Sequence, residues 1–146
     1  MDIDCDGIRT ANCNLMRDRS YQPSTALEPG GRPLNAETTP YVAIPQRGPI
    51  FDFGKQHIKL GAVAAIIYKG KLTYAVVGDV GPVEIIGEAS YGAAKILGID
   101  PDPSSGGVGT GVTYVVFANT RVADPRSRAS ITKAGQAAAA GLLAGN

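Results

Sequence analysis

The stretch GAVAAIIYKGKLTYAVVGDV, residues 61–80, carries the strongest fold signal in the chain. Two apolar runs rich in β-branched residues, 63–68 and 72–77, flank the polar triplet KGK. This pattern is typical of a β-hairpin with a short turn. We therefore predict two antiparallel strands here, around which the other elements are arranged.

Weaker signals on both sides of the hairpin indicate a mostly β protein with a few helices. Residues 1–36 are polar and rich in turn residues, so this N-terminal segment is predicted to be irregular. Short strands combined with one or two helices suggest a small β-barrel with helical additions. Further strands are expected at 38–45, 83–86 and 112–118, and helices at 88–98, ending at Gly98, and at 130–146.

The length and composition limit the possible partners. A chain of 146 residues is expected to form one domain, 1–146, with its own core. Its net charge of +1 and the absence of a basic stripe argue against a nucleic-acid or membrane-surface partner. No apolar run is long enough to cross a bilayer. We expect a monomer that binds neither nucleic acid nor membrane.

The two cysteines, Cys5 and Cys13, lie close together in the irregular segment. Their spacing matches no zinc motif, so they are either a local disulfide of a secreted protein or two free thiols. We favour the disulfide, because it would hold together a segment with little core of its own. We expect a secreted protein whose export signal has been removed.

Two further motifs are weaker. DIDCDG, residues 2–7, matches the opening of a calcium loop, but Cys13 stands where an EF-hand has its closing acid. We favour a solvated acidic turn over a weak calcium site at Asp2, Asp4 and Asp6. His57 is the single histidine and has no nucleophile motif around it, which favours a surface or substrate-contact role.

The stretch VVGDVGPVEIIGEAS, residues 76–90, places Asp79 and Glu88 beside glycines in an apolar segment. Glu84 lies between them and is expected to point outward. Paired carboxylates at the ends of strands suit a glycosidase, in which one acid protonates the leaving oxygen and another activates water. A turn followed by a helix start explains the same residues about equally well.

Several motifs together resemble the chitosanases of glycoside hydrolase family 75. These are DIDCDG, TTPYVAIP, the stretch 60–82 and IGEAS, in this order, with GDVGP and IGEAS the most specific. The resemblance implies an inverting endo-chitosanase without a cofactor, whose catalytic acids are Asp79 and Glu88, ~6.5–9.5 Å apart. It also implies a six-stranded double-psi-like β-barrel, by analogy with expansins and family 45 endoglucanases.

The resemblance leaves the individual roles open. Analogy favours Glu88 as general acid and Asp79 as base, although a helix starting at Glu88 would lower its pKa. Because acids are few, we expect a short groove or a modest preference for deacetylated chains. Two rivals remain, a non-catalytic expansin-like binding module and a single-acid cell-wall lytic enzyme. The candidates for contacts with glucosamine units of chitosan are Asp4, Asp6, Glu37, Asp52, His57 and, by stacking, Tyr91.

Overall fold

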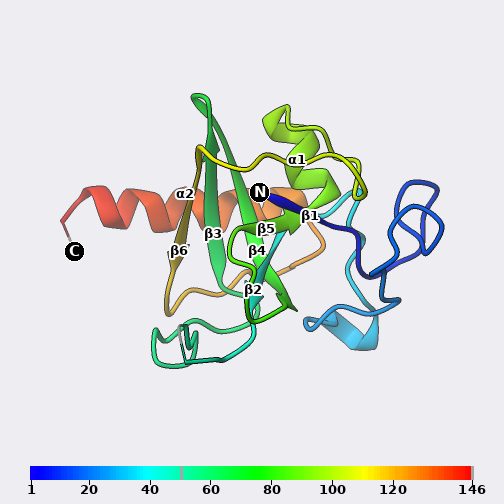
Figure 1. Cartoon of the computed structure of the whole chain (residues 1–146). Helices are drawn as coiled ribbons and strands as arrows, with labels where there is room; N and C mark the ends of the chain where they lie inside the picture. Colours follow the sequence, from blue (N-terminus) through cyan, green and yellow to red (C-terminus); the bar gives the residue numbers. More distant parts are fainter. Residues whose placement is uncertain (50, 146) are drawn as a thin grey trace.

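The computed structural model describes residues 1–49 and 51–145, which form a six-stranded mixed sheet with two α-helices (Figure 1). The end of the predicted C-terminal helix, residue 146, lies outside the described residues. The strands are β1 (Asp2–Asp4), β2 (Tyr41–Pro45), β3 (Val63–Tyr68), β4 (Lys71–Gly81), β5 (Glu88–Ser90) and β6 (Val112–Phe117). The helices are the short 3₁₀ turn η1 (Pro29–Gly31), α1 (Tyr91–Leu97) and α2 (Arg128–Leu143).

The predicted hairpin is confirmed as β3 and β4, which pair antiparallel from Val63↔Val76 to Tyr68↔Lys71. Its two turn residues, Lys69 and Gly70, both have positive φ, at 45° and 76°. Such a turn matches the right-handed twist of the strands. Strand β4 continues to Gly81, beyond the predicted end, and thereby brings Asp79 into the sheet.

The sheet has the strand order β1-β5-β2-β4-β3-β6, with β1 and β6 at its edges. The pairs β1–β5 and β2–β4 are parallel, and the other three are antiparallel. The predicted mostly β class with six strands is confirmed. The sheet is not closed within the described residues, so the expected double-psi β-barrel is not confirmed.

The segment around Glu88 differs from the prediction. The expected strand at 83–86 is wrong, because these residues form a turn and a loop, and the strand is β5 instead. Helix α1 begins at Tyr91, where the Ser90 side chain accepts a hydrogen bond from the Ala93 N–H as N-cap. The predicted stop at Gly98 is confirmed by its left-handed conformation, φ 75°.

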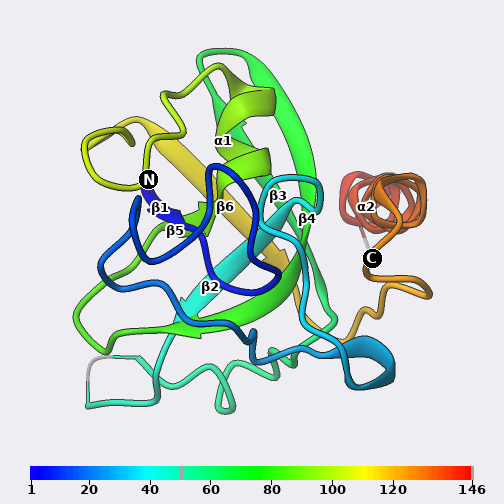
Figure 2. The same ribbon diagram turned by 90° about the vertical axis from the view of Figure 1, so that its right-hand side faces the viewer.

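The two helices cover opposite sides of the β3–β4 hairpin (Figure 2). Alternate side chains of β4 therefore enter two different cores. Ala75 and Val77 pack in the core that α1 completes, and Val76 packs in the core that includes Ile131 of α2. No described helix is both long and apolar enough to pass through a bilayer.

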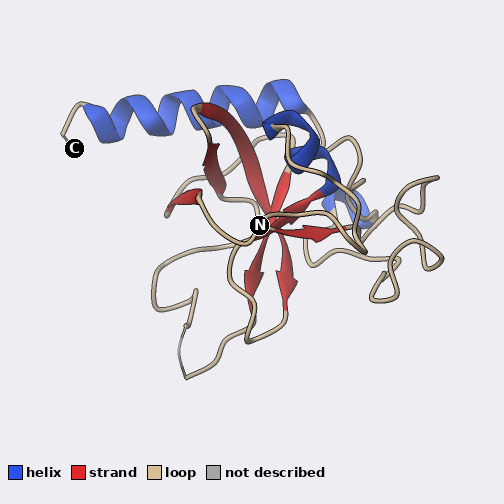
Figure 3. Ribbon diagram, turned by 45° about the horizontal axis from the view of Figure 1, so that its top comes forward, coloured by secondary structure: helices blue, strands red, loops and turns tan. Residues whose placement is uncertain are grey.

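The N-terminal segment is mainly loop, as predicted, but its first residues form the edge strand β1. Figure 3 shows the strands converging at the centre of the molecule, with long loops around them. The predicted disulfide between Cys5 and Cys13 is present, and both residues are fully buried. It fixes the chain directly after β1, where Asp6 lies.

Candidate active site

Asp79 and Glu88 lie on the two strands that flank β2. Both are in register with the same residue, Ala43, Asp79 from β4 and Glu88 from β5. Because neighbouring strands are about 4.8 Å apart, the two backbones are roughly 10 Å apart across β2. Residues in register across neighbouring strands share a face of the sheet, so both carboxyl groups rise from the same face.

A β-bulge at Gly78 places Asp79 on this face. Val42 pairs with Val77, but the next residue of β2, Ala43, pairs with Asp79, so that Gly78 is the extra residue. Without the bulge, Asp79 would share the face of Val77 and enter the apolar core. A Cβ atom on Gly78 would lie 2.7 Å from the Tyr41 Cβ, which explains why glycine stands here.

Strand β1 adds two acids to the same face. It pairs in parallel with β5, with Asp2 opposite Glu88 and Asp4 opposite Ser90. Ile3, between them, points to the other face and is part of the core. The alternation in DIDCDG is therefore that of an edge strand, which sequence reasoning treated as a turn.

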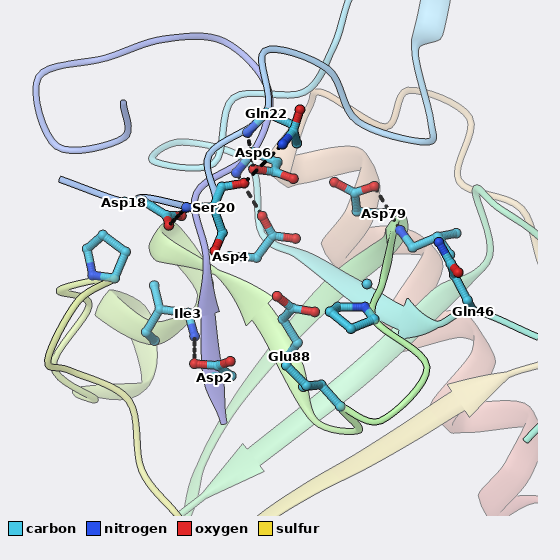
Figure 4. A pocket seen from close by; sticks show the side chains of 15 residues that line it. Asp2, Ile3, Asp4, Asp6, Asp18, Ser20, Gln22, Gln46, Asp79 and Glu88 are labelled. Atoms are coloured by element: carbon cyan, nitrogen blue, oxygen red, sulfur yellow. Dashed lines mark hydrogen bonds between the residues drawn. The ribbon is translucent and has the colours of Figure 1, made fainter. Parts of the chain in front are cut away.

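These acids line a cleft of about 500 Å³ (Figure 4). Six of the chain's 13 acids line it, and none of its described lining residues is Lys or Arg. Asp18 and Gln22 come from the N-terminal loop, and no sequence motif pointed to them. The acidic residues of the cleft are Asp2, Asp4, Asp6, Asp18, Asp79 and Glu88.

The Asp79 side chain is 7% exposed and held at one oxygen. Its Oδ1 accepts hydrogen bonds from the backbone N–H groups of Ala26, at 2.9 Å, and Val80, at 2.8 Å. Oδ2 is buried and has no hydrogen-bond partner. Burial raises the pKa of Asp79, and the two backbone N–H groups oppose the rise. The result is an oriented carboxyl group with one free oxygen.

Glu88 has the same property, a buried oxygen, Oε2, without a hydrogen-bond partner. Burial raises its pKa to about 7, and repulsion from Asp2 and then Asp79 contributes further. The expected opposing effect of a helix dipole is wrong, because α1 begins three residues later and Glu88 lies in a strand. Glu88 is therefore a carboxyl group that retains its proton close to neutral pH.

Asp4 and Asp6 lie beside this pair. Asp4 is 6% exposed, and its Oδ1 accepts hydrogen bonds from the Tyr41 hydroxyl, at 2.9 Å, and the Asp6 N–H, at 2.7 Å. Burial, with repulsion from Asp79 next, raises the pKa of Asp4 well above its usual value. Burial also raises the pKa of Asp6, to about 6.

The other predicted contact residues do not line this cleft. Asp52 pairs with Arg47 at 3.5 Å, and His57 lies exposed in a loop with φ 56°. Glu37 accepts hydrogen bonds from the Thr10 hydroxyl and the Asn12 N–H, so it holds the N-terminal loop. Tyr91 lines a separate, smaller cavity. Glu84 is exposed, as predicted.

Comparisons with known proteins agree with the resemblance. The profile of the family described as fungal chitosanase of glycosyl hydrolase group 75 matches residues 1–140. Endo-chitosanase C of Aspergillus oryzae is 32% identical over 131 residues, which are 87% of this chain and 32% of that protein. Endo-chitosanase B of Aspergillus oryzae is 30% identical over 126 residues, 80% of this chain and 52% of that protein. The chain thus spans about half or less of these relatives.

Proposed function

Since this chain belongs to glycosyl hydrolase group 75, the family of fungal chitosanases, we propose that it is a secreted, monomeric endo-chitosanase that inverts the anomeric carbon. In this proposal Asp79 is the general base and Glu88 the general acid. The disulfide between Cys5 and Cys13 fits an extracellular protein.

One observation carries the assignment of the pair. Among the described residues, two buried side-chain oxygens lack a hydrogen-bond partner, and they belong to Asp79 and Glu88. Buried polar atoms are nearly always satisfied, so such oxygens mark positions at which a ligand completes the bonding. Both face a cleft large enough for sugar units.

The environment of Asp79 suits a base. Oδ1 is held by two backbone N–H groups, so Oδ2 keeps a fixed direction into the cleft and can accept a proton from water. The backbones of Asp79 and Glu88 are roughly 10 Å apart across β2. Inversion requires ~6.5–9.5 Å between the carboxyl groups that they carry, with a water molecule between them.

The environment of Glu88 suits an acid. A general acid must carry its proton when substrate arrives, and the pKa of about 7 leaves Glu88 protonated below neutral pH. In one turnover, Asp79 takes a proton from the attacking water as the water oxygen bonds to the anomeric carbon from the side opposite the leaving group, and the glycosidic C–O bond breaks. Glu88 supplies a proton to the departing sugar oxygen as this bond breaks, after which Asp79 gives up a proton to solvent and Glu88 takes one up.

The charge of the cleft suits a cationic polymer. The cleft has six acids and no lysine or arginine among its described lining residues, so those of its carboxyl groups that are ionised attract the ammonium groups of glucosamine units. From the small number of acids in the chain we predicted a short groove or a modest preference for deacetylated chains. Almost half of these acids lie in this one cleft, so the cleft itself is strongly acidic. We propose that Asp2, which is exposed, and Asp18, which is half-buried, contact these ammonium groups.

Reducing-end release from chitosan by three variants tests the proposal. Asp79→Asn and Glu88→Gln keep the side-chain shapes and are each expected to lower kcat by about 10²–10⁴-fold. Glu84→Gln, an exposed change in the same loop, is the matched control and should retain wild-type activity. NMR of the first product formed should show the α-anomer, as inversion of a β-bond requires.

Each rival predicts a different outcome. If the chain were a binding module, the wild-type chain would bind chitosan but release no reducing ends from it. A single-acid lytic enzyme would tolerate Asp79→Asn and release products from peptidoglycan. A first product with the β-configuration would refute inversion, but it would not contradict Asp79 and Glu88 as the catalytic residues.

A further inference from the structure

Three carboxyl groups of the cleft converge without a cationic partner. Asp4, Asp6 and Asp79 each place a carboxylate oxygen within 4.8 Å of the other two. Within residues 1–49 and 51–145 no lysine or arginine pairs with any of them. Three anions at this separation repel each other strongly in a buried site, so they must share protons or a bound cation.

Hydrogen bonding has already fixed one oxygen on each group. Oδ1 of Asp4 accepts from Tyr41 and Asp6, and Oδ1 of Asp6 accepts from the Gln22 N–H at 2.6 Å. Oδ1 of Asp79 is held by two backbone N–H groups. No described residue donates a hydrogen bond to the second oxygen of any of the three. Figure 4 shows these second oxygens turned toward the space between the three side chains.

Asp79 supplies an observation independent of this proximity. Only 7% of the residue is exposed, so it is more than nine-tenths buried. Its Oδ2 has no hydrogen-bond partner, although buried polar atoms normally have one. An unsatisfied, oriented oxygen beside two more free carboxylate oxygens is the donor set that a hard divalent cation prefers.

We propose that Asp4, Asp6 and Asp79 bind a divalent cation of the Ca²⁺ or Mn²⁺ type. The motif DIDCDG indicated Asp2 as the third ligand beside Asp4 and Asp6. In the structure Asp2 pairs with Glu88 across β1 and β5 and is not part of this group, and Asp79 is the third acid instead. Three carboxylates leave the remaining coordination positions to water. A dissociation constant of about 10⁻⁴–10⁻³ M is expected for such an open site.

Cation binding and catalysis compete for Asp79. A bound cation engages Oδ2, which is then unable to accept a proton from water, so Ca²⁺ should inhibit chitosan hydrolysis. This inhibition rests on the proposed function, in which Asp79 is the base. The binding itself does not, because it needs only the three carboxylates.

Calorimetric titration of metal-free protein with CaCl₂ tests the binding. The measurement is made at a pH of about 8, above the pKa of Asp6, with ionic strength held constant by NaCl. Asp4→Asn and Asp6→Asn are each expected to weaken binding by 10-fold or more. Asp102→Asn, a partly exposed aspartate in another loop, is the matched control and should bind as wild type does. Glu88→Gln should also bind, although it is expected to be inactive.

Mn²⁺ provides a second readout that needs no variant to fold. Its unpaired electrons should broaden the amide signals around residues 4, 6 and 79 in the wild-type chain. The proposal is overturned if no binding is detected at millimolar Ca²⁺, or if Asp102→Asn weakens binding as much as Asp6→Asn. Broadening centred elsewhere overturns it as well. Binding at this site without inhibition would confirm the cation site and refute Asp79 as base.

Discussion

The carboxyl group of Glu88 occupies the space that a side chain on Gly81 would need. A Cβ atom built on Gly81 would overlap Oε2 of Glu88, and the Cβ of Ala43 would lie 3.8 Å from it. The two residues are the last of β4 and the first of β5, on either side of β2. The absence of a side chain at Gly81 therefore determines where the Glu88 carboxyl group can lie.

We predict that Gly81→Ala lowers kcat on chitosan by about 10-fold or more, because Oε2 must leave its present position and a small displacement of a catalytic group is costly. The overlapping atom is the end of a flexible side chain, so the melting temperature should change little. Gly141→Ala in α2, where the new Cβ meets no neighbour, is the control and should leave kcat unchanged. Wild-type kcat in Gly81→Ala would show that the position of Glu88 does not govern catalysis.

Gly78→Ala should affect folding instead. Its Cβ would lie 2.6 Å from Leu34 Cδ1 and 2.7 Å from the Tyr41 Cβ, both in well-packed core residues. Overpacking of this kind lowers the free energy of unfolding by about 1–3 kcal/mol. Urea denaturation measures the loss. An unchanged midpoint would show that the bulge accommodates a side chain, contrary to the close approach described here.

The local elements of this fold were predictable from the sequence, and the site was predictable only in part. The hairpin, the stop at Gly98 and the C-terminal helix follow from runs of residues adjacent in the chain. Spacing and family motifs selected Asp79 and Glu88, which the structure brings into one cleft. The helix start predicted at Glu88 was wrong because Ser90, two residues after Glu88, is the actual N-cap.

Long-range register accounts for what the sequence did not reveal. The bulge at Gly78 exists only because β4 pairs with β2, and this pairing reverses the face on which Asp79 lies. The convergence of Asp4 and Asp6 with Asp79 likewise depends on the β1–β5 pair. No property of DIDCDG alone distinguishes an edge strand from an acidic turn.

The pH dependence of activity should follow the two raised pKa values. Glu88 must be protonated to act as acid, so kcat/KM should fall as pH rises through about 7. Asp79 must be ionised to act as base, so kcat/KM should also fall as pH drops through the pKa of Asp79, which burial raises above the usual value of an aspartate. Initial rates on a soluble glucosamine oligosaccharide measure both limbs. An alkaline limb near pH 4.5, the ordinary glutamate value, would contradict Glu88 as a buried acid.

The disulfide should stabilise the N-terminal loop that carries Asp6 and Asp18. A double variant, Cys5→Ala with Cys13→Ala, is expected to lose about 2–4 kcal/mol of unfolding free energy. Because the loop also lines the cleft, KM for chitosan should rise. Reduction of the disulfide in the wild-type chain, followed by denaturation in urea, measures the same loss of unfolding free energy without a substitution. Equal midpoints for the oxidised and reduced chains would contradict a stabilising role.

Stability should be greatest in mildly acidic solution. Asp4, Asp6, Asp79 and Glu88 have pKa values raised by folding, so the folded chain holds their protons more tightly than the unfolded chain does. Their contribution is complete below the ordinary values of 3.8–4.5 and is lost as pH rises through the folded values, about 6 for Asp6 and about 7 for Glu88.

Glu37 acts in the opposite direction, because its folded pKa is lowered and its contribution is lost as pH falls. The melting temperature should therefore peak at about pH 4–5 and decline toward pH 8. Asp4→Asn, which removes one of the groups with a raised pKa, should make the decline shallower, whereas Asp102→Asn should leave it unchanged. A melting temperature that rises from pH 5 to pH 8 would mean that the clustered acids are compensated by a cation in the folded chain.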